Sequence, residues 1–183
     1  MILTHDSEPW HHMVGMDPGE TTGFCAIRFG PPYPPSAPLR KAIARGEVYM
    51  GQVEAGATRE AGRGGPWFVQ EARLQRNMAG RLRSLAEQWG VEGCLHLAIE
   101  DFTLRERTKD RSLLSPVRMT AGVLALLEHD DELNVVVHLN SASDGKGTVT
   151  DTVLHRLGLY RAGMQHANDA ARQAVLALRK EQG

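Results

Sequence analysis

The sequence of 183 residues has little cysteine and almost no net charge. Its two cysteines, Cys25 and Cys94, are too few for a disulfide framework or a cysteine-based zinc site. Both lie in apolar runs, which predicts buried, reduced thiols. The formal net charge of −1 gives no overall attraction to nucleic acids or acidic membranes. Any site for a polyanion must therefore be a local basic patch.

Long apolar runs are also lacking. None reaches the length of a membrane span, and the first residues do not have the basic-then-apolar order of a secretory signal. We therefore expect a cytoplasmic protein that does not enter membranes. A hydrophobic content of 42% over this length is typical of one globular domain. Residues 1–12 are polar and predict an N-terminal extension, and residues 13–183 predict the domain.

The most informative stretch runs from Met13 to Ile27. An apolar run ends on Asp17, a Pro-Gly pair follows, and a second apolar run begins at Thr22. This order predicts a β-hairpin. Asp is depleted in strands, and a carboxylate beside a buried sheet is costly unless a positive group compensates it. From this stretch alone, Asp17 could be either a turn residue or a metal ligand.

The remaining pattern alternates strands with helices. A proline-rich connection follows the hairpin, and Thr148–Asp151 fits a capping box at the start of a later helix. An antiparallel meander followed by βαβ units predicts an α/β fold, with a mixed five-stranded sheet flanked by helices. Its first three strands should be antiparallel and the others parallel. The predicted strands are 13–17, 22–29, 46–53, 94–102 and 134–139, and the predicted helices are 66–90, 115–129, 148–158 and 166–180.

Some of these elements have predicted buried faces. Residues 134–139 are nearly all apolar and should form a buried strand. In the long helix, apolar side chains recur at helical spacing from Phe68 to Trp89 and should face the core. The helix at 115–129 has a stripe from Val117 to Leu127 and further apolar surface besides. Such a helix is expected inside the body or at a subunit interface.

Acidic residues lie at the ends of the predicted elements, namely Asp17, Glu100 and Asp169. His166 precedes Asp169 by three residues, so the two share a helix face. If the first and fourth strands are neighbours, Asp17 and Glu100 face the same cleft. Adjacent strand residues point to opposite faces, so only one of Glu100 and Asp101 can join Asp17. Clustered carboxylates require cations, and oxygen ligands favour Mg²⁺ or Mn²⁺.

This residue set indicates phosphodiester hydrolysis. Two divalent ions about 4 Å apart can clamp the attacking and leaving oxygens of a phosphodiester. One ion would activate water, and the other would stabilise the departing 3′ oxygen. His166 could be a metal ligand or a general base near neutral pH. The predicted catalytic and metal-binding residues are Asp17, Glu100, His166 and Asp169.

Three motifs in this order resemble those of the RuvC family of Holliday-junction resolvases, within the RNase H-like superfamily. Met16–Gly19 followed by Thr22–Gly23 resembles the first-strand motif of the family. Ala98–Glu100 resembles its second acidic motif, and His166–Ala170 resembles the motif that starts its C-terminal helix. Together the motifs cover the chain from residue 13 to 178. Each motif is weak by itself, but their order on these elements is specific.

The resemblance implies an RNase H-like nuclease domain and a homodimer that nicks two strands of a four-way DNA junction symmetrically, in recombination or repair, with Mg²⁺ or Mn²⁺. It also implies that the segment after Glu100 reaches into the junction. Phe102 could stack there on an unpaired base, or belong to the core instead. Basic side chains would contact phosphates. These predicted DNA-binding residues are Arg105, Arg107, Lys109, Arg111, Arg118 and Lys146.

Three segments depart from the compact bacterial members of that family: the N-terminal extension, the proline-rich insertion and the Gly-rich loop at 54–65. They imply a diverged branch, such as a phage-encoded one, and leave the substrate open. The alternatives are a flap or RNA/DNA-hybrid nuclease of the same fold, and an inactive protein that binds branched DNA. An actin-like ATPase lobe is disfavoured, because it needs a second glycine-rich phosphate loop and a much longer chain.

Overall fold

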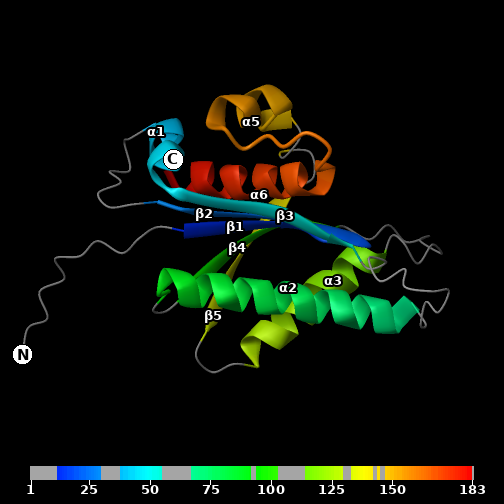
Figure 1. The fold of residues 1–183 in the computed structure, drawn as a ribbon. Helices are drawn as coiled ribbons and strands as arrows, with labels where there is room; N and C mark the ends of the chain where they lie inside the picture. Colours follow the sequence, from blue (N-terminus) through cyan, green and yellow to red (C-terminus); the bar gives the residue numbers. More distant parts are fainter. Residues whose placement is uncertain are drawn as a thin grey trace, which may run out of the picture.

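A mixed β-sheet forms the centre of the molecule (Figure 1). The strand order is β3-β2-β1-β4-β5. The β1–β2 and β2–β3 pairs are antiparallel, and the β1–β4 and β4–β5 pairs are parallel. This is the predicted five-stranded α/β sheet. The strands are β1 (His12–Asp17), β2 (Thr21–Arg28), β3 (Glu47–Glu54), β4 (Cys94–Asp101) and β5 (Asn134–Ser141).

Helices cover both faces of the sheet (Figure 1). The helices are α1 (Leu39–Arg45), α2 (Trp67–Trp89), α3 (Ser115–Glu128), α5 (Asp151–Leu157) and α6 (Gln165–Gln182). One face carries α1, α5 and α6, and the other carries α2 and α3. No helix among the described residues combines the length and apolar character needed to span a membrane. The computed structural model describes residues 12–29, 38–54, 67–91, 94–102, 114–129, 133–141, 144 and 147–182.

The β1–β2 hairpin forms as predicted and places Asp17 at the last position of β1, paired with Gly23. Both strands are largely buried, because helices pack against each face. The buried Thr22 closes the turn through Gly19. Its hydroxyl donates to the Gly19 carbonyl at 2.9 Å and accepts from the Gly19 N–H at 3.3 Å. Asp17 is therefore fixed by the hairpin at a defined strand end.

Helix α6 packs directly on β1 and β2. Its alanine-rich face is buried in the core on that side of the sheet. Two glycines of the hairpin allow this approach, since a methyl group at Gly15 would collide with the Ala170 carbonyl and one at Gly23 with the His166 carbonyl. The first turns of α6 therefore lie against the hairpin that carries Asp17.

Strand β5 is one of the two outer strands of the sheet, so the prediction of a buried strand was wrong. Val136, Val137 and Leu139 are exposed, Leu139 by 59%. Only β4 pairs with β5, and in the described structure Val135 is its one apolar side chain that packs against the α2–α3 core. A short apolar run does not by itself distinguish a central strand from an edge strand.

The buried stripe of helix α3 shares only Leu127 with the predicted one. Met119, Val123 and Leu127 are buried, whereas Val117 and Leu124 are only half-buried. A helix that is apolar all round offers several possible stripes, and contact with α2 selects one of them. Helix α2 forms as predicted, except that Phe68 in its first turn is 56% exposed.

The two cysteines differ in their environment. Cys25 is buried, and burial raises the pKa of its thiol to about 12, so the predicted buried thiol is confirmed there. Cys94 is exposed at the first position of β4, which contradicts the same prediction. The first residue of a strand lies at the rim of the sheet, where an apolar neighbourhood in sequence does not ensure burial.

Two short helices differ from the sequence-based expectation. Helix α1 follows Pro38 and was not predicted, because its two buried side chains, Ala42 and Ile43, are too few for a periodic signal. Helix α5 begins at Asp151, with Thr150 as its N-cap and no side-chain capping hydrogen bond, so the predicted capping box does not form. Asp151 instead forms an ion pair with Arg172 of α6.

Candidate active site

Two adjacent strands bring two of the predicted acidic residues to one edge of the sheet. Asp17 ends β1, Glu100 lies near the end of β4, and the two strands are parallel neighbours. Met16 pairs with Ile99, so Asp17 and Glu100 come next along the two strands. Both lie on the α6 face, because strand residues alternate between faces. Asp101 belongs to the opposite face and is exposed.

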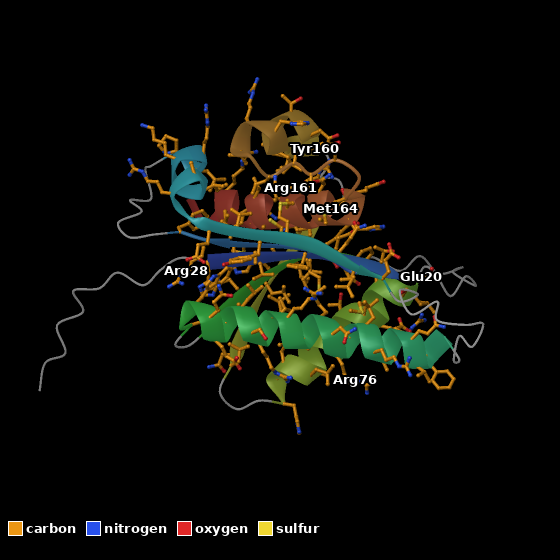
Figure 2. All side chains as sticks on the ribbon, in the orientation of Figure 1. Glu20, Arg28, Arg76, Tyr160, Arg161 and Met164 are labelled. Atoms are coloured by element: carbon orange, nitrogen blue, oxygen red, sulfur yellow. The ribbon has the colours of Figure 1, made fainter. Side chains whose placement is uncertain are left out.

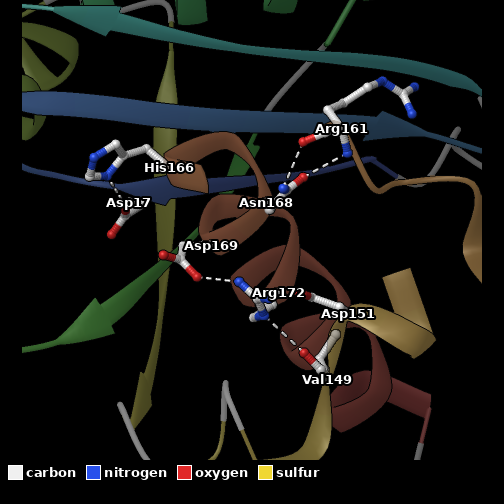
Figure 3. Close-up of polar contacts among 8 residues, drawn as sticks. All are labelled: Asp17, Val149, Asp151, Arg161, His166, Asn168, Asp169 and Arg172. Carbon is white, nitrogen blue, oxygen red and sulfur yellow. Dashed lines mark hydrogen bonds and ion pairs between the residues drawn. The ribbon is translucent and has the colours of Figure 1, made fainter. Parts of the chain in front are cut away.

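The first turns of α6 add an imidazole and a third carboxylate. His166 Nδ1 lies 2.8 Å from Asp17 Oδ2, so the imidazole N–H donates to the Asp17 carboxylate (Figure 3). Asp169 is one helical turn further along the same face. Its charge acts on Asp17, as does the charge of Glu100. The fold thus brings the four predicted catalytic residues into one neighbourhood.

The pKa of Asp17 is raised to about 6. Burial is the largest cause, because desolvation disfavours the charged carboxylate. The hydrogen bond from His166 opposes the shift, and the negative charge of Asp169 adds to it. Glu100 contributes a smaller effect in the same direction as Asp169. A carboxylate that is both desolvated and surrounded by like charge is stabilised by a cation.

The donor set suits a hard divalent cation. Asp17, Glu100 and Asp169 offer carboxylate oxygens, which Mg²⁺ and Mn²⁺ prefer, and His166 offers an imidazole nitrogen. Among the described residues, however, no three such groups converge closely enough to enclose an ion. Holding a cation would therefore require side-chain rotation around the fixed Asp17.

Arg172 is a residue of this site that the sequence-based analysis missed. Its guanidinium forms ion pairs with Asp169 and Asp151, and its Nε–H donates to the Val149 carbonyl at 3.0 Å (Figure 3). The available signal was the spacing on α6, because positions 166, 169 and 172 lie on one helix face. The partner Asp151 is distant in sequence and had no such signal.

A second set of hydrogen bonds fixes the start of α6. The Asn168 side chain accepts from the Arg161 N–H at 2.9 Å and donates to the Arg161 carbonyl at 2.9 Å (Figure 3). Asn168 is buried, so these bonds are shielded from water. Figure 2 shows Tyr160, Arg161 and Met164 on the α5–α6 side of the sheet. Asn168 thereby ties the segment before α6 to the turn that carries His166 and Asp169.

A cavity of about 760 Å³ opens beside Asp169. It lies between α5 and the start of α6, and its lining is mostly polar. Thr150, Tyr160 and Gln165 contribute hydrogen-bonding groups to it, and among the described lining residues Arg172 is the cation. Asp169 is therefore the member of the carboxylate cluster that this polar cavity reaches.

The predicted DNA-binding residues are mostly outside the described part of the chain. Phe102 is half-buried just after β4. Arg118 pairs with Glu71 at 3.0 Å and thus links α3 to α2, while its phosphate contact stays a prediction. The predicted residues that lie outside the described ranges are Arg105, Arg107, Lys109, Arg111 and Lys146.

Comparison with known proteins gives structural matches only. No protein-family model matches the sequence, and no curated protein is significantly similar to it. T. thermophilus RuvC in complex with a Holliday junction superposes with a TM-score of 0.59 at 14% identity, over 94% of this chain and 97% of that chain. The yeast mitochondrial Holliday junction resolvase Ydc2 superposes with a TM-score of 0.54 at 12% identity, over 93% of this chain and 79% of that chain. The chain therefore has the RuvC-like form of the RNase H-like fold.

Proposed function

We propose that this protein is a divalent-metal-dependent endonuclease that cleaves four-way DNA junctions by phosphodiester hydrolysis. One observation carries the proposal. The Asp17 side chain lies at a strand end and is only 16% exposed, it accepts a hydrogen bond from His166, and it is surrounded by the charges of Glu100 and Asp169. Such crowding is unfavourable unless cations neutralise it. The RuvC-like fold supports a junction substrate, because the similar T. thermophilus RuvC is seen in complex with one.

The roles of the residues follow from their positions. Asp17, held by the hairpin, would be the central oxygen ligand, with Glu100 and Asp169 on either side. Mg²⁺ or Mn²⁺ ions bound there would supply a polarised water and charge stabilisation for the leaving 3′ oxygen. His166 is oriented by its bond to Asp17, so it could complete the ligand set or accept a proton from water.

Symmetric nicking requires two active sites, and the described part of the chain supplies one such site. We therefore propose a homodimer. Helix α3 supports this, because Ala121 and Ala125 are exposed and Val117 is only half-buried on its outer side. The basic residues after β4, together with Phe102, are proposed to contact the junction. Recombination or repair is the process in which such a nuclease would act.

Cleavage of several substrates under identical conditions tests this function. A mobile four-way junction, a flap and an RNA/DNA hybrid should be incubated with Mg²⁺, and the cuts mapped on every strand. Symmetric nicks in two strands of the junction alone would support a resolvase. Preferential cutting of the flap or hybrid would support another nuclease of the same fold. Binding of the junction with no cleavage in Mg²⁺ or Mn²⁺ would leave only a branched-DNA-binding protein.

Two neighbouring carboxylates offer a matched test of the active site. Asp17→Asn and Glu100→Gln should each reduce junction cleavage by about 10³-fold or more, because each removes a metal ligand. Junction binding, measured by gel shift with Ca²⁺, should change little. Asp101→Asn removes an equal charge on the opposite face of the sheet and should cleave at the wild-type rate. If Asp17→Asn cleaved the junction at the wild-type rate, the assignment of Asp17 as a metal ligand would be refuted.

A further inference from the structure

Arg172 occupies a confined position at the rim of the carboxylate cluster. Its side chain is only 13% exposed, and that of its partner Asp169 is 16% exposed. Burying a guanidinium is costly unless its donors are paired. Two carboxylates and a backbone carbonyl pair them here. Arg172 is therefore held in one orientation.

The three contacts point in different directions. Nη1 bonds to Asp169, Nη2 bonds to Asp151, and Nε bonds to the Val149 carbonyl (Figure 3). Only a guanidinium has donors in this fixed fork; a lysine ammonium on a flexible stem cannot reproduce it. The geometry therefore depends on arginine as such and not on positive charge alone.

Two of these three contacts lie outside the carboxylate cluster. Val149 precedes α5, and Asp151 is the first residue of that helix, with a side chain 58% exposed. Arg172 is therefore positioned by the start of α5, and it in turn orients Asp169. A carboxylate has two oxygens, so Asp169 can bond to Arg172 with one and still present the other to a cation.

We propose that Arg172 is a positioning residue, anchored by Asp151 and the Val149 carbonyl, which fixes Asp169 for divalent-cation binding. Asp151, which touches none of the other proposed ligands in the contacts described above, thereby controls the cation affinity of the site. The inference rests on the proposed function, since it takes Asp169 to be a metal ligand. Groups that orient metal ligands typically change metal affinity by about 10–100-fold when removed.

Mn²⁺ binding to the full chain without DNA tests this inference. The EPR signal of free Mn²⁺ measures how much of the ion is bound. Asp151→Ala should weaken Mn²⁺ binding by about tenfold, at the lower end of that range, because Arg172 retains one anchor. Asp151→Asn loses the same charge but keeps an oxygen that can accept from Nη2, so its affinity should lie nearer to wild type. Arg172→Lys keeps the charge and loses the fork, so it should weaken binding at least as much as Asp151→Ala.

The controls separate positioning from simple charge and from folding. Glu87→Ala removes one exposed carboxylate from α2, on the other side of the sheet, and should bind Mn²⁺ within twofold of wild type. Thermal unfolding without metal should show each variant folded. Equal weakening by Asp151→Asn and Asp151→Ala would indicate a charge effect and overturn the inference. If wild type binds Mn²⁺ and Asp151→Ala binds it with the same affinity, the inference is also overturned. If wild type does not bind Mn²⁺, the proposed function is refuted as well.

Discussion

Asp17 combines two roles that conflict in the absence of a cation. Its side chain is largely desolvated at the strand end, with 16% exposure, and its neighbours Asp169 and Glu100 carry the same charge. The hydrogen bond from His166 compensates only in part, because the pKa of Asp17 still rises to about 6. The site therefore stores unfavourable electrostatic free energy that a divalent cation would relieve. This is a pattern expected of functional residues rather than of structural ones.

The raised pKa predicts how stability depends on pH at this residue. The folded pKa of about 6 exceeds the unfolded value of 3.8, so protonated Asp17 stabilises the fold below pH 4. That contribution is lost as the pH rises through 6. Asp17→Asn stays neutral, so without divalent metal it should be more stable than wild type at pH 8, by up to about 3 kcal/mol.

Urea unfolding in EDTA at pH 8 and near pH 4 would measure this difference in the free energy of unfolding. At the lower pH the variant and wild type should be similar. Added Mg²⁺ should stabilise wild type and leave Asp17→Asn unchanged, because a ligand stabilises only the state that binds it. Equal stability of the two proteins at pH 8 in EDTA would contradict the electrostatic account of Asp17.

Among the elements, α6 and the β1–β2 hairpin determine the geometry of the site. His166 reaches Asp17 only because its own backbone lies against Gly23. The hydrogen bonds of Asn168 and the ion pairs of Arg172 then fix the helix from its outer side. The residues that hold α6 in place are thus different from those that would do the chemistry.

Close packing of α6 makes Gly23 intolerant of a side chain. Gly23→Ala would place a methyl group against the His166 carbonyl, so α6 must move. We expect a loss of about 1–3 kcal/mol in the free energy of unfolding, as for other overpacked sites. Junction cleavage should fall by about tenfold or more even where the protein is folded, because small misplacements of catalytic groups are costly.

Gly80 of α2 provides the matched control for this substitution. Nothing in the described structure lies within 4 Å of a methyl group at that position. Gly80→Ala should therefore stabilise the helix by up to about 1 kcal/mol and leave cleavage unchanged. Chemical denaturation and the junction assay test both variants together. If Gly23→Ala matched Gly80→Ala, contact between α6 and the hairpin would not limit the site.

At the scale of the whole molecule, the proposed paired nicking depends on the proposed dimer. The outer side of α3 offers a small-residue surface that a partner subunit could cover. Ala121→Glu would place a charge on it without disturbing the buried stripe through Met119, Val123 and Leu127. We expect the variant to sediment as a folded monomer of 20.1 kDa and to make single nicks instead of paired ones.

An exposed alanine on the opposite side of the molecule gives the corresponding control. Ala44 of α1 is exposed, and Ala44→Glu introduces the same charge away from α3. It should sediment and cleave like wild type. A monomeric wild type would contradict the proposed dimer. A dimer that survives in Ala121→Glu would place the interface elsewhere.

Much of the fold could be predicted because its signals are local. The Pro-Gly turn after Asp17 predicts the hairpin, and periodic apolar residues predict α2 and α6. The spacing of His166 and Asp169 places both on one helix face. These predictions succeed because turn chemistry and helix periodicity depend on residues a few positions apart.

The tertiary structure alone decided the rest. Asp17 and His166 are 149 positions apart, and only the packing of α6 on the hairpin brings them to 2.8 Å. The same holds for Arg172 with Asp151, for the edge position of β5, and for the buried stripe of α3. Sequence by itself determined which residues could do the chemistry. Which of them meet, and what holds them there, depends on long-range contacts that no local pattern encodes.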